Sequence, residues 1–280
     1  MQPARGDATL VPAEAGCQGR GSGIFEFDVR TALLLGALTT LLLGLLLALV
    51  SRGFPAMLRP ALMLWLRASV MQPLGFVLFA LRGHIHDLLS VLLANALIAV
   101  AFADYARALH RLSGRPEPLR LIQALVAVDL ALIAFFTLAL DHIGARIVIA
   151  SSTLGILCAY AVRGAMHGPV GSRTMAQWVL GTVFAGGAAV VTTRALHTVL
   201  FPEPVADGLQ SGAMQAVTFA SGALLPLLGS YAFLLRCTDL MRDEVERGAA
   251  MDYLTGIANR GAIEGEGVRC VLRARRRGTR

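Results

Sequence analysis

The sequence predicts an all-α membrane protein with about seven transmembrane helices. Apolar residues make up 56% of the 280 residues and charged residues only 15%, whereas about 25% of the residues in a soluble domain are charged. Seven segments approach the roughly 20 apolar residues that a helix needs to cross a hydrocarbon core. They cover residues 32–50, 62–81, 88–108, 119–140, 147–166, 176–200 and 213–235.

The seven segments differ in how clearly they are apolar. The first is the clearest, because Leu, Ala, Gly and Thr fill almost all of residues 33–49. The second is the weakest, because Arg67 and Pro73 interrupt it, and Pro226 interrupts the seventh. A proline inside a helix usually kinks it and frees a carbonyl group. Residues 1–24 are rich in Gly and Ala and have no apolar run, so we expect no signal peptide. We expect residues 1–30 to be a disordered tail; an artefact of an upstream start codon is the alternative.

The arginines predict the orientation of the helices. With seven spans, the loops on one side hold Arg52, Arg59, Arg107, Arg111, Arg115, Arg120, Arg163 and Arg173, and the other side holds only Arg30, Arg82 and Arg146. Positively charged loops stay in the cytoplasm. The N-terminus is therefore predicted outside and the C-terminus inside.

Composition also excludes some classes of protein. The chain has no lysine, so it cannot be a seven-helix retinal protein, which needs a lysine amine for its Schiff base. The four cysteines, Cys17, Cys158, Cys237 and Cys270, form no C-x-x-C pair. They predict neither a disulfide framework nor a metal knuckle.

After residue 235 the sequence changes abruptly from apolar to mixed charge. Residues 236–251 are predicted to form a cytosolic linker helix, in which Leu240, Met241 and Val245 lie at helical spacing and can pair with a second subunit. The alternative is a solvated helix end that stops at Gly248. The nonapeptide that begins at Asp252 follows, with Gly256 suited to a turn and Asn259 to a helix N-cap. Its sequence is Asp252-Tyr253-Leu254-Thr255-Gly256-Ile257-Ala258-Asn259-Arg260.

This segment resembles the opening of the GGDEF domain of bacterial diguanylate cyclases, which matches D-x-L-T-G-[LI]-x-N-R. The matching positions are Asp252, Leu254, Thr255, Gly256, Asn259 and Arg260. The resemblance implies a cyclic di-GMP signalling protein of the bacterial inner membrane. It also implies an α/β output domain that begins at residue 252, and a homodimer by analogy. Residues 31–235 would then be a transmembrane input domain in contact with the lipid bilayer, and the ligand that it senses is not identified.

The resemblance also indicates which parts of the family are missing. An intact member binds Mg²⁺ and GTP through a first-strand carboxylate and the glycine-rich GGDEF turn, and no position in residues 252–280 matches them. Gly261 and Ile263 stand where the family usually has arginine and an aromatic residue. We therefore expect no catalytic residue, no cofactor and no cyclase activity in this chain. A truncated record, a frameshifted gene and a genuine short protein stay open.

Three ionisable residues inside the predicted spans are candidates for a functional site. Asp129 lies near the middle of the fourth segment, and charges at that depth are usually paired or functional. We expect an interhelical ion pair between Asp129 and Arg67 or Arg194; a proton relay is the alternative.

Histidines on the outer side form a second candidate set. His84, His86, His142 and His197 are predicted near Asp87, Asp141 and Glu203. They could form a metal or pH sensor, or they are ordinary polar residues at the ends of the spans, which is the interpretation that we favour. No metal site is predicted.

Two alternatives to a signalling module stay open, a small transporter and a non-functional gene remnant. Asp129, Pro73 and Pro226 favour a transporter, and the segment at Asp252 argues against it. The arginines of residues 273–280 could contact anionic lipid, or they are the solvated end of the family's first helix, which is the interpretation that we favour. They lack the aromatic residues of a nucleic-acid site, so no nucleic-acid partner is predicted.

Overall fold

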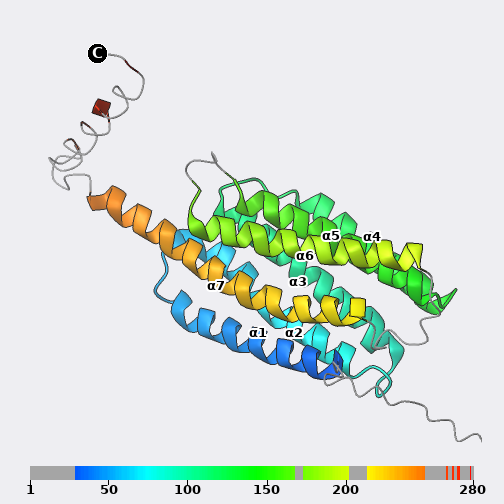
Figure 1. Cartoon of the computed structure of the whole chain (residues 1–280). Helices are drawn as coiled ribbons and strands as arrows, with labels where there is room; N and C mark the ends of the chain where they lie inside the picture. The colour runs from blue at the N-terminus through cyan, green and yellow to red at the C-terminus, as the bar shows by residue number, and fades with distance from the viewer. Residues whose placement is uncertain are drawn as a thin grey trace, which may run out of the picture.

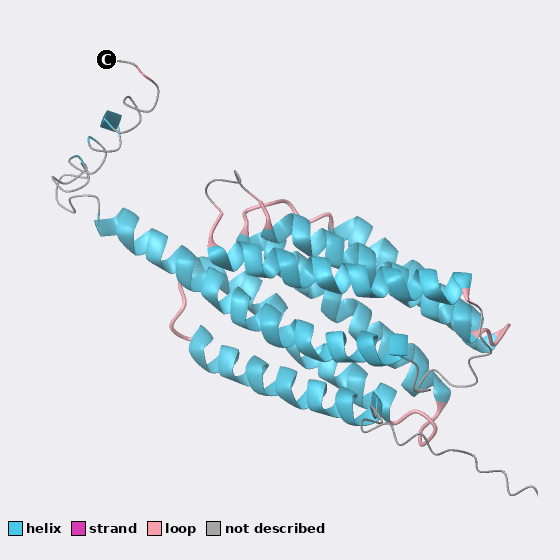
Figure 2. Ribbon diagram, viewed as in Figure 1, coloured by secondary structure: helices cyan, strands magenta, loops and turns pink. Residues whose placement is uncertain are grey.

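The computed structural model of the chain is a bundle of long helices that lie roughly side by side (Figures 1 and 2). It describes residues 29–167, 173–201 and 213–249, together with the isolated positions 263, 267, 270, 271 and 278. The helices are α1 (Val29–Ser51), α2 (Arg59–Ala80), α3 (Ala94–Leu112), α4 (Leu119–Leu138), α5 (Ile143–Ala165), α6 (Met175–Leu200) and α7 (Ala213–Ala249), with a 3-10 turn η1 (Ala56–Leu58) before α2 and a π-helix η2 (Leu88–Leu93) before α3.

Seven described helices are long and apolar enough to cross a membrane. This confirms an all-α membrane protein with seven spans, including the second segment, in which α2 continues through Pro73. The side chains that face away from the bundle are apolar: eight leucines of α1 are about half exposed, as expected of a lipid-facing surface. The predicted α/β GGDEF domain falls almost entirely outside the described residues, in which no strand is present.

Six of the helices form a closed ring, and the seventh lies against it. Backbone contacts join α1 to α2, α2 to α3, α3 to α5, α5 to α6, α6 to α7 and α7 back to α1. Helix α4 packs mainly on α5 and less closely on α3. It is also the span with the smallest buried share. Helix α4 is therefore the least firmly held of the seven.

Small residues let α1 pack closely against α2 and α7, its two neighbours in the ring. A Cβ atom added at Gly36 would lie 2.7 Å from the Cβ of Ala223 on α7, and one added at Gly44 would lie 2.8 Å from the Cβ of Ser69 on α2. Only glycine permits such close backbone approach, which is how small residues promote helix association in membranes.

Helix α7 extends beyond the other helices at one end of the bundle (Figure 1). Its 37 residues correspond to about 55 Å at 1.5 Å per residue, well above the roughly 30 Å of a hydrocarbon core. We call this end the α7 end; it also holds the connections α1–α2, α3–α4 and α5–α6.

Candidate functional site

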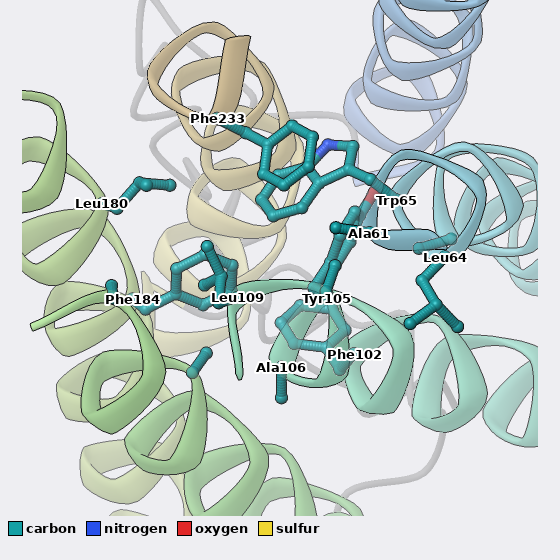
Figure 3. Close-up of a cluster of buried hydrophobic side chains, with 14 of the residues drawn as sticks. Ala61, Leu64, Trp65, Phe102, Tyr105, Ala106, Leu109, Leu180, Phe184 and Phe233 are labelled. Carbon is teal, nitrogen blue, oxygen red and sulfur yellow. The ribbon is translucent and has the colours of Figure 1, made fainter. Parts of the chain in front are cut away.

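An aromatic cluster fills the centre of the ring (Figure 3). Trp65 of α2 stacks on Phe233 of α7, with ring centroids 4.0 Å apart and an interplanar angle of 17°. Tyr105 of α3 and Phe184 of α6 pack against the same indole. All four side chains are buried. Four helices that are distant in the sequence thus meet at one indole ring.

Hydrogen bonds fix the orientation of this cluster. Trp65 Nε1 donates to Ser230 Oγ of α7 at 3.0 Å, so the indole binds α7 by both stacking and a hydrogen bond. Tyr105 Oη donates to Gln72 Oε1 at 3.1 Å, which links α3 to α2. Buried tryptophan and tyrosine normally need such partners.

Gln72 also binds the point at which Pro226 interrupts α7. In an ideal helix the N–H of residue 226 would bond to the carbonyl of Gly222, but proline has no N–H. Gln72 Nε2 donates to that carbonyl oxygen at 3.3 Å, and Gln72 is fully buried. A side chain of α2 therefore replaces the backbone bond that Pro226 removes, and α7 remains one continuous helix.

Arg67 pairs with Asp104 of α3, so the predicted pair between Arg67 and Asp129 is wrong. The guanidinium contacts both carboxylate oxygens, Nε to Oδ2 and Nη2 to Oδ1, each at 2.5 Å. Arg107 Nη1 adds a third bond to Oδ1 at 3.1 Å. The reason is the lateral arrangement of the helices: α2 is a neighbour of α3, whereas α4 packs on α5 and α3.

The ion pairs continue into the α3–α4 connection at the α7 end. Arg107 Nε donates to Glu117 Oε2 at 2.8 Å, and Arg111 Nε contacts Oε1. Partial burial by itself would raise the pKa of Glu117, but the two arginines outweigh it and lower this pKa below its ordinary value. Sequence analysis did not single out Asp104 or Glu117. Spacing could have identified Asp104. It lies eight residues before Leu112, where α3 ends, and Arg67 lies eight residues after Arg59, where α2 begins. Because α2 and α3 are antiparallel neighbours, the two residues lie at the same depth.

Asp129 and Arg194 do not pair with each other. Asp129 is buried in the middle of α4, and its Oδ1 has no hydrogen-bond partner. Arg194 lies on α6, where its guanidinium carbon is 5.7 Å from the ring centroid of Phe219 on α7 and its Nε has no hydrogen-bond partner. Because α4 and α6 are not packed neighbours, the predicted pair between Asp129 and Arg194 is also wrong.

Two of the outer histidines have structural roles at helix starts. His142 Nδ1 accepts a hydrogen bond from the N–H of Ala145 and so caps α5, and His86 Nδ1 accepts one from the N–H of Leu88 at the start of η2. Among the described residues, no three His, Cys, Asp or Glu side chains come close enough to hold a metal ion. Glu203 lies outside the described residues.

The packed part of α7 extends past the predicted boundary at residue 235. Cys237 is fully buried, and Leu240 and Met241 pack against the core of their own bundle. Of the three residues expected to face a second subunit, only Val245 is exposed. The motif at Asp252, Leu254, Thr255, Gly256, Asn259 and Arg260 lies outside the described residues.

Comparison of the chain with protein-family models, with curated proteins and with solved structures finds no match.

Proposed function

We propose that the seven-helix bundle is the membrane input module of a cyclic di-GMP signalling protein and that α7 carries its signal. The observation that supports the proposal most is the continuity of α7. The same helix contacts the aromatic centre through Phe233 and Ser230, extends past the bundle, and leads towards the D-x-L-T-G-x-x-N-R segment. A rotation or shift of α7 within the bundle would therefore reach whatever follows residue 249.

The bundle offers a physical route for such a movement. Trp65 and Gln72, both on α2, bind α7 at Phe233, Ser230 and Gly222. Pro226 lies between these contacts, and a helix bends most readily at a proline. A signal that changes the packing of α2 and α3 would change the bend of α7 at Pro226. Packed helices have discrete arrangements, so such a change can act as a switch.

The arginines support a cytoplasmic α7 end. Arg52, Arg59, Arg111, Arg120 and Arg163 all lie at that end in the structure, and positively charged loops favour the cytoplasm. In this orientation α7 would deliver the signal to the compartment that contains GTP. The bacterial inner membrane and a homodimer belong to the same proposal.

A fusion protein tests this function. Residues 1–260 would be joined in register to a complete GGDEF domain, and cyclic di-GMP would be measured in cells that carry the wild-type fusion or the same fusion with Trp65→Ala. We expect production that depends on the bundle and changes with Trp65→Ala, while the matched change Trp178→Phe, at a half-exposed tryptophan of α6, has no effect. Equal production by a fusion without residues 29–235 would contradict the proposal.

A small transporter is the second candidate function, and Asp129 at mid-depth in the bundle favours it. Transporter sites usually lie between broken helices. Here α2 continues through Pro73 and α7 through Pro226, which favours the signalling module.

A further inference from the structure

A small cavity lies between α3, α4 and α5, at mid-depth in the bundle. Asn95, Asp129 and Thr153 supply its polar atoms, one from each helix, and Ile98, Ala99 and Leu154 are among its apolar walls. The cavity is about the size of one water molecule.

The oxygen atoms around this cavity are available for a ligand. Asn95 Nδ2 donates to the carbonyl of Val91 at 2.7 Å. Because an amide has one donor group and one acceptor, this bond leaves Oδ1 free to accept from, or coordinate, another group. Thr153 faces the Asp129 carboxylate. Asp129 Oδ1 itself has no partner, although Asp129 is only 2% exposed.

An ionised carboxylate at this depth is costly when Thr153 is its only hydrogen-bond partner and Oδ1 has none. Burial of an ionised group in an apolar environment requires a partner of opposite charge or several hydrogen bonds. The arginines considered as partners are elsewhere: Arg67 binds Asp104, and Arg194 lies against Phe219. Arg146 of α5 binds Asp141 and Thr137 near the C-terminal end of α4. None of these arginines supplies the positive charge that an ionised Asp129 carboxylate would need.

We propose that Asp129, Asn95 and Thr153 form an internal binding site for one sodium ion. Hard cations prefer oxygen ligands such as carboxylate, amide and hydroxyl groups. One carboxylate balances a single positive charge, which favours a monovalent ion over a divalent one. A dehydrated sodium ion is smaller than a water molecule, so the cavity can hold it without rearrangement of the helices.

The position of the site gives the ion a structural effect. Helix α4 is the span with the smallest buried share, and the site joins it to α3 and α5. A bound ion would therefore hold α4 against the ring. Beside the site, η2 forms a π-helix at Leu88–Leu93, and such π-segments are frequent at functional sites. This inference rests on the cavity alone and does not depend on a cyclic di-GMP output.

The test is thermal unfolding of the purified full chain in detergent at constant ionic strength, with sodium chloride exchanged for choline chloride. Because a ligand that binds only the folded protein stabilises it, we expect a saturable rise of about 2–6 °C in the melting temperature with sodium. Asp129→Asn should abolish this rise. Asn95→Leu and Thr153→Val should shift its midpoint to higher sodium concentration. The matched control is Asp141→Asn, which removes an exposed carboxylate from the connection between α4 and α5. This variant should retain the rise in melting temperature.

Two outcomes would overturn the site. One is a wild-type melting temperature that is the same in sodium and in choline, whatever its dependence on pH. The other is a sodium dependence that Asp129→Asn leaves intact. If Asp129→Asn fails to fold, binding of radioactive sodium to membranes with the wild-type chain or Thr153→Val decides the question: we expect weaker binding by the variant, and equal binding would overturn the site. None of these measurements involves a nucleotide, so their failure is distinct from failure of the proposed output.

Discussion

Trp65 of α2 and Phe233 of α7 stack at the centre of the bundle, with ring centroids 4.0 Å apart. The indole also donates a hydrogen bond to Ser230, one helical turn away from Phe233. Helix α7 therefore contacts α2 inside the ring through the stacked pair and this hydrogen bond. Through this contact and the bond from Gln72 to the Gly222 carbonyl, α2 holds α7 on both sides of Pro226.

Truncation of the central indole should destabilise the whole bundle. Trp65→Ala removes a fully buried ring that contacts three other aromatic side chains. Such changes cost about 3–5 kcal/mol, so we expect a strongly lowered melting temperature in detergent. Trp65→Phe keeps an aromatic ring but loses the bond to Ser230 and part of the buried ring volume, so it should cost less, about 2 kcal/mol. The control is Trp178→Phe, half exposed on α6; a loss as large as that of Trp65→Ala would contradict the central role of Trp65.

The Gly222 carbonyl should make the effects of Gln72 and Pro226 depend on each other. Gln72→Met leaves this carbonyl without its donor, at a cost of about 1–3 kcal/mol. In Pro226→Ala the backbone N–H of residue 226 can bond to Gly222 directly, so adding Gln72→Met should then cost clearly less. A double-mutant cycle on melting temperature measures the coupling. Strictly additive effects would show that Gln72 does not substitute for the missing backbone bond. Gln123→Met, at an exposed position of α4, is the control and should have little effect.

Removal of the Asp104 carboxylate should be much worse than removal of an exposed one. Asp104→Asn removes a carboxylate whose side chain is 1% exposed, so Arg67 loses its ion-pair partner and Arg107 keeps Glu117. Breaking a fully buried pair costs roughly 3–5 kcal/mol. Because Arg67 is itself half exposed, we expect about 2 kcal/mol. The comparison is Asp141→Asn, whose carboxylate is 81% exposed although its partner Arg146 is 10% exposed, and which should cost less than Asp104→Asn. Equal effects of the two variants on thermal unfolding would contradict the assignment of Arg67 to Asp104.

Glu117 should make stability depend on pH in the acid range. Its pKa in the folded protein lies below the ordinary value of 4.5, since Arg111 and Arg107 outweigh partial burial. A lowered pKa gives stability that is present above the ordinary value and is lost as pH falls below it. Glu117→Gln should therefore cost about 1 kcal/mol at neutral pH. The difference between wild type and variant should shrink as pH falls below about 4.5. A difference that stays constant with pH would show that Glu117 acts only through packing.

The sequence predicts the depth of residues in the membrane much better than their lateral partners. Apolar length alone predicted seven spans, because a hydrocarbon core imposes that length on each helix. Hydropathy does not encode the order of the helices around the ring, so Asp129 was matched with Arg67 and Arg194, which lie on helices that are not packed against α4. The start of α5 was also predicted four residues late, because Arg146 is charged. In the structure Arg146 lies inside the helix and binds Asp141.

The contacts at the centre of the bundle could not be predicted from the sequence either. Trp65 and Phe233 are 168 positions apart, and neither belongs to a sequence motif that would predict their contact. The role of Gln72 depends on Pro226 on another helix, since a carbonyl freed by proline accepts any donor that the fold brings near. The D-x-L-T-G-x-x-N-R segment, in contrast, is visible only in the sequence, because it lies outside the described residues.

The most direct test of the central claim is a series of insertions in α7 of the fusion protein with a complete GGDEF domain. One to seven alanines would be inserted between Met241, which packs on the core, and Arg242, which is exposed. Each residue rotates the following helix by about 100°, and alanine keeps it helical. If α7 transmits its orientation, cyclic di-GMP production should change most after two or five residues and return towards its original level after four and seven, close to one and two full turns. Production that does not follow this period would contradict transmission through α7.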